Sequence, residues 1–133
     1  MGYLFDTDTI SAVLRPRPDT TVMQRLAMVP QTDQFTSAIT LGELIFGARR
    51  KGRGDLLQRI HELVDFVPVL PFDEGSANVY GALKADLERN GTPLAEPDLR
   101  IAAIAMSRNL TLVTGNTRHF ARMPGLILEN WLG

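Results

Sequence analysis

Four side chains could together bind a cation and act on a phosphate ester: Asp6, Glu43, Asp98 and Asn116. If the carboxylates met, each pair at ~4 Å would repel by roughly 4 kcal/mol at an effective dielectric near 20, so the set would need a counter-charge. The sequence has no cysteine and 2 histidines, and an all-oxygen set of ligands favours Mg²⁺ or Mn²⁺ over zinc. The natural chemistry of such an ion is to activate water for in-line attack on a phosphodiester.

Asp6 has the clearest position of the four. It directly follows the apolar residues 3–5, which predict a short buried strand because aromatic and aliphatic side chains suit a covered sheet. Ligands of open α/β sheets bind beyond the carboxyl ends of the strands. Asp6 is therefore a candidate for chemistry, with Asp8 two residues later.

The first acids also have structural explanations. Asp6 or Asp8 can cap the helix that follows the strand. Thr40 and Glu43 have the T-x-x-E spacing of a capping box, in which Glu43 reaches back to the backbone N–H of Thr40. Taken singly, these residues do not require a catalytic role.

The same holds for the later pair. Asp98 lies in the first turn of a predicted helix after Pro97, where the helix dipole favours any carboxylate. Asn116, in Gly115-Asn116-Thr117, is an ordinary turn residue. The functional interpretation therefore depends on whether the set comes together.

Strands and helices alternate along the chain. The apolar runs predict strands at residues 3–5, 34–39, 67–72, 110–114 and 126–128, with helices between them. This order indicates parallel βαβ units and one α/β domain of about five strands over residues 1–133, with the 67–72 strand at an edge because of its prolines.

The carboxyl ends of parallel strands and the starts of the helices that follow them share one edge of the sheet. Asp6, Glu43 and Asn116 meet that condition. Asp98 opens a helix that leads into a strand, so parity alone predicts the opposite edge. It reaches the others only if the preceding long helix returns the chain to their edge.

Composition excludes several classes of protein. A length of 133 residues suits one compact domain, and the lack of cysteine excludes disulfide scaffolds, zinc–thiolate sites and cysteine nucleophiles. With 14 basic and 15 acidic side chains, contact with nucleic acid requires a local patch. There is no basic leader, and no apolar run approaches ~18 residues, so we expect no signal peptide, no membrane span and a cytoplasmic location.

Four parts of the sequence resemble PIN-domain ribonucleases: residues 4–8, Glu43, residues 98–103 and residues 110–120. The ending, 123–126 with Glu129-Asn130-Trp131, is especially similar to the VapC toxins of VapBC toxin–antitoxin pairs. The resemblance covers essentially the whole chain, and the order and spacing of its motifs make it specific.

This resemblance implies a Rossmann-like PIN fold and an endoribonuclease that depends on Mg²⁺ or Mn²⁺. It also implies a homodimer, an RNA substrate and inhibition by a small antitoxin that occupies the acidic pocket. Asp6, Glu43 and Asp98 are then the acidic core that binds metal, and Asn116 is the fourth catalytic position.

Two positions depart from the pattern of the family. Many PIN domains have a fourth acid where this chain has Asn116, and some of these toxins have Asp or Glu where it has His119. Asn116 can still ligate metal or position water, and His119 can either hold a phosphate or be a plain surface residue. We therefore expect one firmly bound metal, with a second only when substrate supplies oxygens.

The clearest candidates for RNA contacts outside the acids are Arg49, Arg50, Lys51 and Arg53, with Arg15 and Arg17 in an earlier loop. As RNA contacts they would bind backbone phosphates without choosing a sequence. They are equally well explained as a helix C-terminus and a solvated loop.

Other functions fit parts of the sequence. Residues 4–9 also match the signature of haloacid-dehalogenase phosphatases, in which Asp6 would be a phosphorylated nucleophile. Those enzymes need a later Lys and a further acidic pair, and neither Asp nor Lys follows Asp98. A catalytically inert PIN-like binding module is supported by Asn116 alone. A dinucleotide-binding domain lacks its G-x-G-x-x-G after the first strand.

Overall fold

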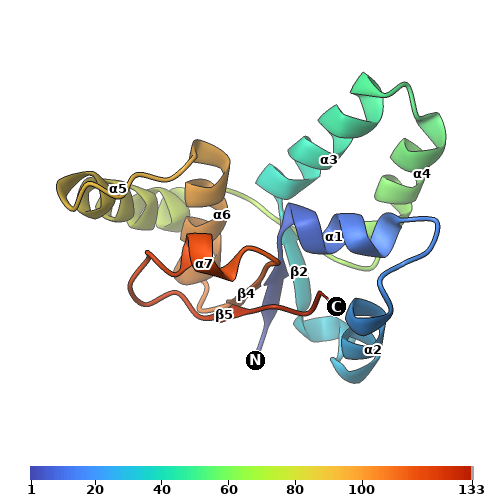
Figure 1. Ribbon diagram of the computed structural model, residues 1–133, viewed down its shortest axis with the longest axis horizontal. Helices are drawn as coiled ribbons and strands as arrows, with labels where there is room; N and C mark the ends of the chain where they lie inside the picture. Colours follow the sequence, from blue (N-terminus) through green and yellow to red (C-terminus); the bar gives the residue numbers. More distant parts are fainter. Residues whose placement is uncertain (133) are drawn as a thin grey trace.

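The computed structural model describes residues 1–132. Their five strands form one sheet in the order β3-β2-β1-β4-β5, with every neighbouring pair parallel. Helices cover both faces (Figure 1). The elements are β1 (Tyr3–Phe5), α1 (Thr7–Leu14), α2 (Thr20–Met28), η1 (Gln31–Asp33), β2 (Gln34–Ser37), α3 (Ala38–Arg50), α4 (Gly54–Leu63), β3 (Val69–Leu70), α5 (Glu74–Arg89), α6 (Glu96–Ser107), β4 (Thr111–Val113), α7 (Thr117–Phe120) and β5 (Leu128–Glu129). The predicted α/β class and strand number are confirmed.

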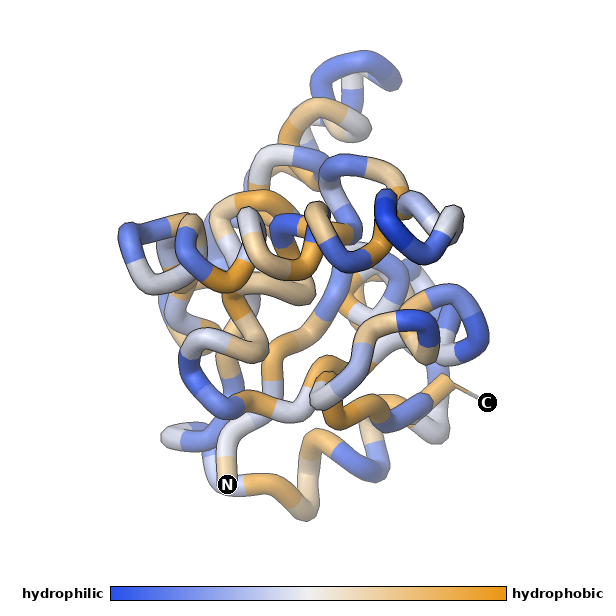
Figure 2. The backbone as a smooth tube through the Cα atoms, turned by 90° about the vertical axis from the view of Figure 1, so that its left-hand side faces the viewer, coloured by the Kyte–Doolittle hydropathy of each residue, from blue (hydrophilic) through white to orange (hydrophobic). Residues whose placement is uncertain are grey.

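The central strand β1 feeds two hydrophobic cores. Leu4 belongs to the core formed with α5, α6 and β4, while Phe5 belongs to the core formed with α1, α2, α3 and α4. Successive side chains of a strand point to opposite faces, so two adjacent apolar residues require cover on both sides. Figure 2 shows hydrophobic and hydrophilic stretches alternating along the helices, as expected for helices with one buried face.

Three strands are shorter than their apolar runs predicted, and one is displaced. β2 ends at Ser37, β3 spans only Val69–Leu70, and β4 spans Thr111–Val113. The last strand begins at Leu128, because Leu126 N–H donates to the Met123 carbonyl and so belongs to a turn. The edge position of β3 is confirmed.

Side-chain caps fix where the helices begin. Asp6, Asp19 and Asp73 accept from the backbone N–H groups of Thr9, Val22 and Ser76, at the starts of α1, α2 and α5. Within residues 1–132 no helix is long and apolar enough to cross a membrane.

Candidate active site at the carboxyl edge of the sheet

Asp6 lies at the end of the central strand and is 5 % exposed. Its Oδ1 accepts from Thr9 N–H at 2.9 Å, which satisfies one backbone donor of the first turn of α1. The Thr114 hydroxyl also interacts with the carboxylate, whereas the Thr9 hydroxyl donates to the Val113 carbonyl at 3.0 Å. The structural explanation of Asp6 as a helix cap is therefore confirmed, and it does not exclude a second role for the remaining oxygen.

Burial raises the pKa of Asp6 above 3.8, the hydrogen bonds from Thr114 and Thr9 oppose that rise, and the nearby Asp8 carboxylate adds to it. Among residues 1–132 no Lys or Arg forms an ion pair with Asp6. A buried carboxylate without a cation nearby is favoured in its protonated form, and a bound cation would reverse this preference.

This burial predicts a pH-dependent stability difference between wild type and Asp6→Asn, measured in EDTA. Burial places the pKa of Asp6 in the folded state above its value in the unfolded state. The charged, buried carboxylate therefore destabilises the folded wild type above the folded-state pKa, and this destabilisation is relieved as the pH falls through that pKa. Asn keeps the cap but does not titrate. We expect the variant's advantage in unfolding free energy to be largest near about pH 7 and to shrink towards about pH 4. Urea denaturation at both pH values measures it, and a constant difference would contradict it.

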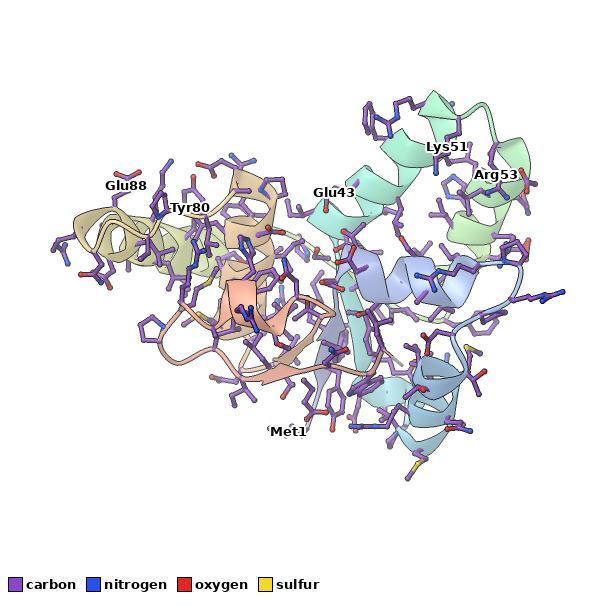
Figure 3. The ribbon with its side chains drawn as sticks, viewed as in Figure 1. Met1, Glu43, Lys51, Arg53, Tyr80 and Glu88 are labelled. Carbon is purple, nitrogen blue, oxygen red and sulfur yellow. The ribbon has the colours of Figure 1, made fainter. Side chains whose placement is uncertain are left out.

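Glu43 lies in the second turn of α3 and faces the same edge. Its Oε1 accepts from the Thr7 hydroxyl at 2.6 Å, and Thr7 is the residue directly after Asp6. The predicted capping box is wrong. α3 begins at Ala38, and the Ser37 hydroxyl accepts from Thr40 N–H at 3.0 Å, so Glu43 lies too far into the helix to cap it. Its carboxylate is thereby available to the site (Figure 3).

Asp98 lies in the first turn of α6, and its Oδ2 is 3.0 Å from Nε2 of His119. His119 belongs to α7, which follows β4 at the carboxyl edge of the sheet. The side chains of His119 and Asp98 are 25 % and 34 % exposed, so water reaches the pair. This contact places Asp98 at the same edge as Asp6.

The parity argument for Asp98 is wrong, and the chain path explains why. α6 turns directly into β4 and therefore runs antiparallel to it, which brings its first turn to the carboxyl edge. The condition that the preceding helix returns the chain there is met. The start of α5 contacts the end of α6 through Asp73 and Arg108, and later Lys84 reaches Glu96 at the start of α6.

The loop after β4 connects the surroundings of Asp6 and Asp98. Asn116 N–H donates to the hydroxyl of Thr114, which also contacts Asp6, and the Asn116 carbonyl accepts from His119 N–H at 3.1 Å. The Asn116 side chain is exposed and makes no capping hydrogen bond. One short segment therefore positions groups around two of the acids.

The predicted acids share one edge of the sheet without forming a closed metal cage. Within residues 1–132 no three His, Asp or Glu side chains are grouped closely enough to hold an ion. Glu43 is turned towards Thr7, and Asp98 towards His119. The chemistry of the donors fits a hard divalent cation, because the acids supply oxygen and, within residues 1–132, no ion pair joins the buried Asp6 to a Lys or Arg.

Three supporting residues were missed from the sequence: Thr7, Thr114 and, as a partner of Asp98, His119. A hydroxyl directly after Asp6 and another at the end of the most apolar strand were the available signals. Two residues of the predicted basic cluster lie away from Glu43. Lys51 and Arg53 lie at the far end of the α3–α4 pair from Glu43 (Figure 3), and Arg53 pairs with Asp55 at 2.7 Å.

The sequence profile of the PIN domain matches residues 3–126. The chain belongs to the PIN domain family. A tRNA(fMet)-specific endonuclease VapC of Shigella flexneri is 35 % identical to this PIN domain over 132 residues, which cover 98 % of each chain. Ribonuclease VapC2 of Rickettsia felis is 30 % identical over 132 residues, again 98 % of each.

Solved structures agree with this membership. The crystal structure of VapBC2 from Rickettsia felis bound to a DNA fragment from their promoter has a TM-score of 0.91 at 29 % identity, over 98 % of this PIN domain and 99 % of that chain. DNA-bound VapBC from Salmonella typhimurium also gives 0.91, at 32 % identity and 98 % of both chains. The predicted family and PIN fold are confirmed. The haloacid-dehalogenase phosphatase alternative is rejected, because the chain belongs to the PIN domain family.

Proposed function

We propose that this protein is a VapC-type endoribonuclease toxin that hydrolyses RNA phosphodiester bonds and is inhibited by a small cognate antitoxin. The observation that carries the proposal is that Asp6, Glu43 and Asp98 lie at the same carboxyl edge of the sheet, in a chain whose family and relatives are nucleases. Residues 1–133 act as one catalytic domain in this proposal.

The acids have distinct tasks. Asp6 supplies the fixed, buried oxygen, because its cap to Thr9 leaves little rotamer freedom. Glu43 and Asp98 are more exposed, and each has one oxygen hydrogen-bonded, to Thr7 and to His119 respectively, which leaves the other oxygen for the ion. Together they would hold Mg²⁺ or Mn²⁺, whose chemistry is to activate a water molecule and neutralise charge on the phosphate. Asn116, exposed beside them, is positioned to orient water or a phosphate oxygen.

The direct test is cleavage of structured RNA by the purified chain, freed of any partner, with Mg²⁺, Mn²⁺ or EDTA. Cleavage that EDTA abolishes and Mn²⁺ restores is the expected result. Absence of cleavage with every added metal would favour the inert binding module, for which Asn116 in place of an acid remains the supporting observation.

Thr7→Val tests the orientation of Glu43. Val keeps the shape of Thr7 but removes the hydroxyl that donates to Glu43 at 2.6 Å. Partners that orient a metal ligand are typically worth about 10–100-fold in activity, so we expect a loss of cleavage in that range. Thr7→Ser keeps the donor and is the matched control. Equal activity of the Val and Ser variants would show that the hydroxyl does not orient Glu43.

In the proposed complex an apolar segment of the antitoxin binds a groove between α1, α3 and α4, in addition to the part that occupies the acidic pocket. The groove has a volume of about 210 Å³, and its apolar residues Leu14, Leu44 and Leu56 are flanked by Arg15, Lys51 and Arg53. An apolar segment with acidic neighbours complements this lining, so the basic cluster is better placed for a partner than for RNA at Glu43. A homodimer is part of the same proposal.

A further inference from the structure

One of the two oxygens of Asp98 is already engaged. His119 Nε2 lies 3.0 Å from Oδ2, and an ionised carboxylate only accepts, so the imidazole donates. Sequence reasoning treated His119 as a phosphate contact or a surface residue, and neither role describes a hydrogen bond to an acid of the site.

Both partners are held by the core. Leu99, next to Asp98, and Phe120, next to His119, are each 2 % exposed. His119 N–H donates to the Asn116 carbonyl, and its ring stands edge-on to Phe120 with centroids 5.5 Å apart. The buried neighbours fix α6 and α7, so Asp98 and His119 form their hydrogen bond without any movement of the backbone.

This hydrogen bond affects how many ions the site can hold. Paired ions in two-metal sites lie about 3.5–4 Å apart, and a carboxylate that binds one ion through each of its oxygens needs both oxygens free. In Asp98, Oδ2 is taken by the imidazole and Oδ1 remains. At the fourth position this chain offers only the neutral amide of Asn116.

We propose that His119 is a positioning residue that fixes Oδ2 of Asp98, presents Oδ1 to the metal and thereby limits the centre to one divalent ion. This inference rests on the proposed function, because it assigns a role at the same metal site. A purely structural role of His119 would affect folding but not the number of ions bound.

The test is the number and affinity of Mn²⁺ ions bound by the purified chain. Titration calorimetry and electron paramagnetic resonance of free Mn²⁺ measure both. The variants are His119→Ala, His119→Gln and His119→Glu, with Arg118→Gln on the same helix as an exposed control. Gln can donate from a position close to that of Nε2, whereas Glu removes the donor and adds a carboxylate beside Asp98. Thermal unfolding in EDTA reports separately on folding.

We expect one Mn²⁺ per chain for wild type, Arg118→Gln and His119→Gln. His119→Ala should bind one ion about tenfold or more weakly, and His119→Glu should bind two. Wild-type affinity in His119→Ala, or a single ion in His119→Glu, would overturn the inference while leaving the proposed nuclease intact. A wild type that binds no Mn²⁺ and cleaves no RNA would instead overturn both.

Discussion

Asp6→Asn is expected to lower the rate of RNA cleavage by roughly 10³-fold or more while the protein remains folded. Loss of the charge removes the buried, fixed oxygen ligand of the site, and metal-centred stabilisation is worth several kcal/mol, at about 1.4 kcal/mol per tenfold in rate. Asn retains the helix cap at Thr9, so α1 keeps its first turn.

The measurement is single-turnover cleavage with saturating Mn²⁺, accompanied by thermal unfolding with and without the metal. Mn²⁺ should raise the melting temperature of the wild type and leave that of Asp6→Asn unchanged, because only a ligand that binds the folded state stabilises it. Asp8→Asn is the matched control, since Asp8 is exposed and two residues away. Cleavage by Asp6→Asn at the wild-type rate would refute the assignment of Asp6 as a metal ligand.

Trp131→Ala is expected to lower the free energy of unfolding by about 3–5 kcal/mol, the usual range for a buried Trp. Trp131 is 1 % exposed, and its ring centroid lies 5.1 Å from that of Tyr3 and 5.3 Å from that of Phe5. Its indole N–H donates to Glu129 at 2.9 Å. The residue therefore fastens the C-terminal segment to the central strand that carries Asp6.

Trp131→Phe separates packing from the hydrogen bond. Phe keeps an aromatic ring against Tyr3 and Phe5 but leaves a smaller void and no donor for Glu129, so the loss should be clearly smaller. Denaturation by urea, with far-UV circular dichroism as the probe, measures all three proteins. A loss of under about 1 kcal/mol for Trp131→Ala would show that the core at this end is replaceable.

The sequence was sufficient for the parts of the site that depend on local pattern. An apolar run followed by an acid placed Asp6 at a strand end, the alternation of strands and helices predicted a parallel sheet, and the prolines around β3 predicted its edge position. Glu43 was placed near the start of its helix, although the cap proved to be Ser37, because T-x-x-E also occurs inside helices where an earlier hydroxyl supplies the cap.

Contacts between distant segments could not be predicted in this way. The Asp98–His119 pair joins residues 21 positions apart and depends on the four-residue α7, which has no periodicity to detect. The Thr7–Glu43 bond spans 36 positions. Both contacts follow from how helices pack at the edge of the sheet, and a hydrophobic pattern does not specify that packing.

The two outermost strands limit how copies of this chain can associate. β3 and β5 are two residues long each, and Pro68 and Pro71 flank β3 without a backbone N–H to offer. A neighbouring chain would find too little free backbone on either side to extend the sheet across a subunit boundary. The proposed homodimer would therefore be built from helical surfaces, which leaves the carboxyl edge of the sheet, where the acids lie, open to a long, flexible polymer.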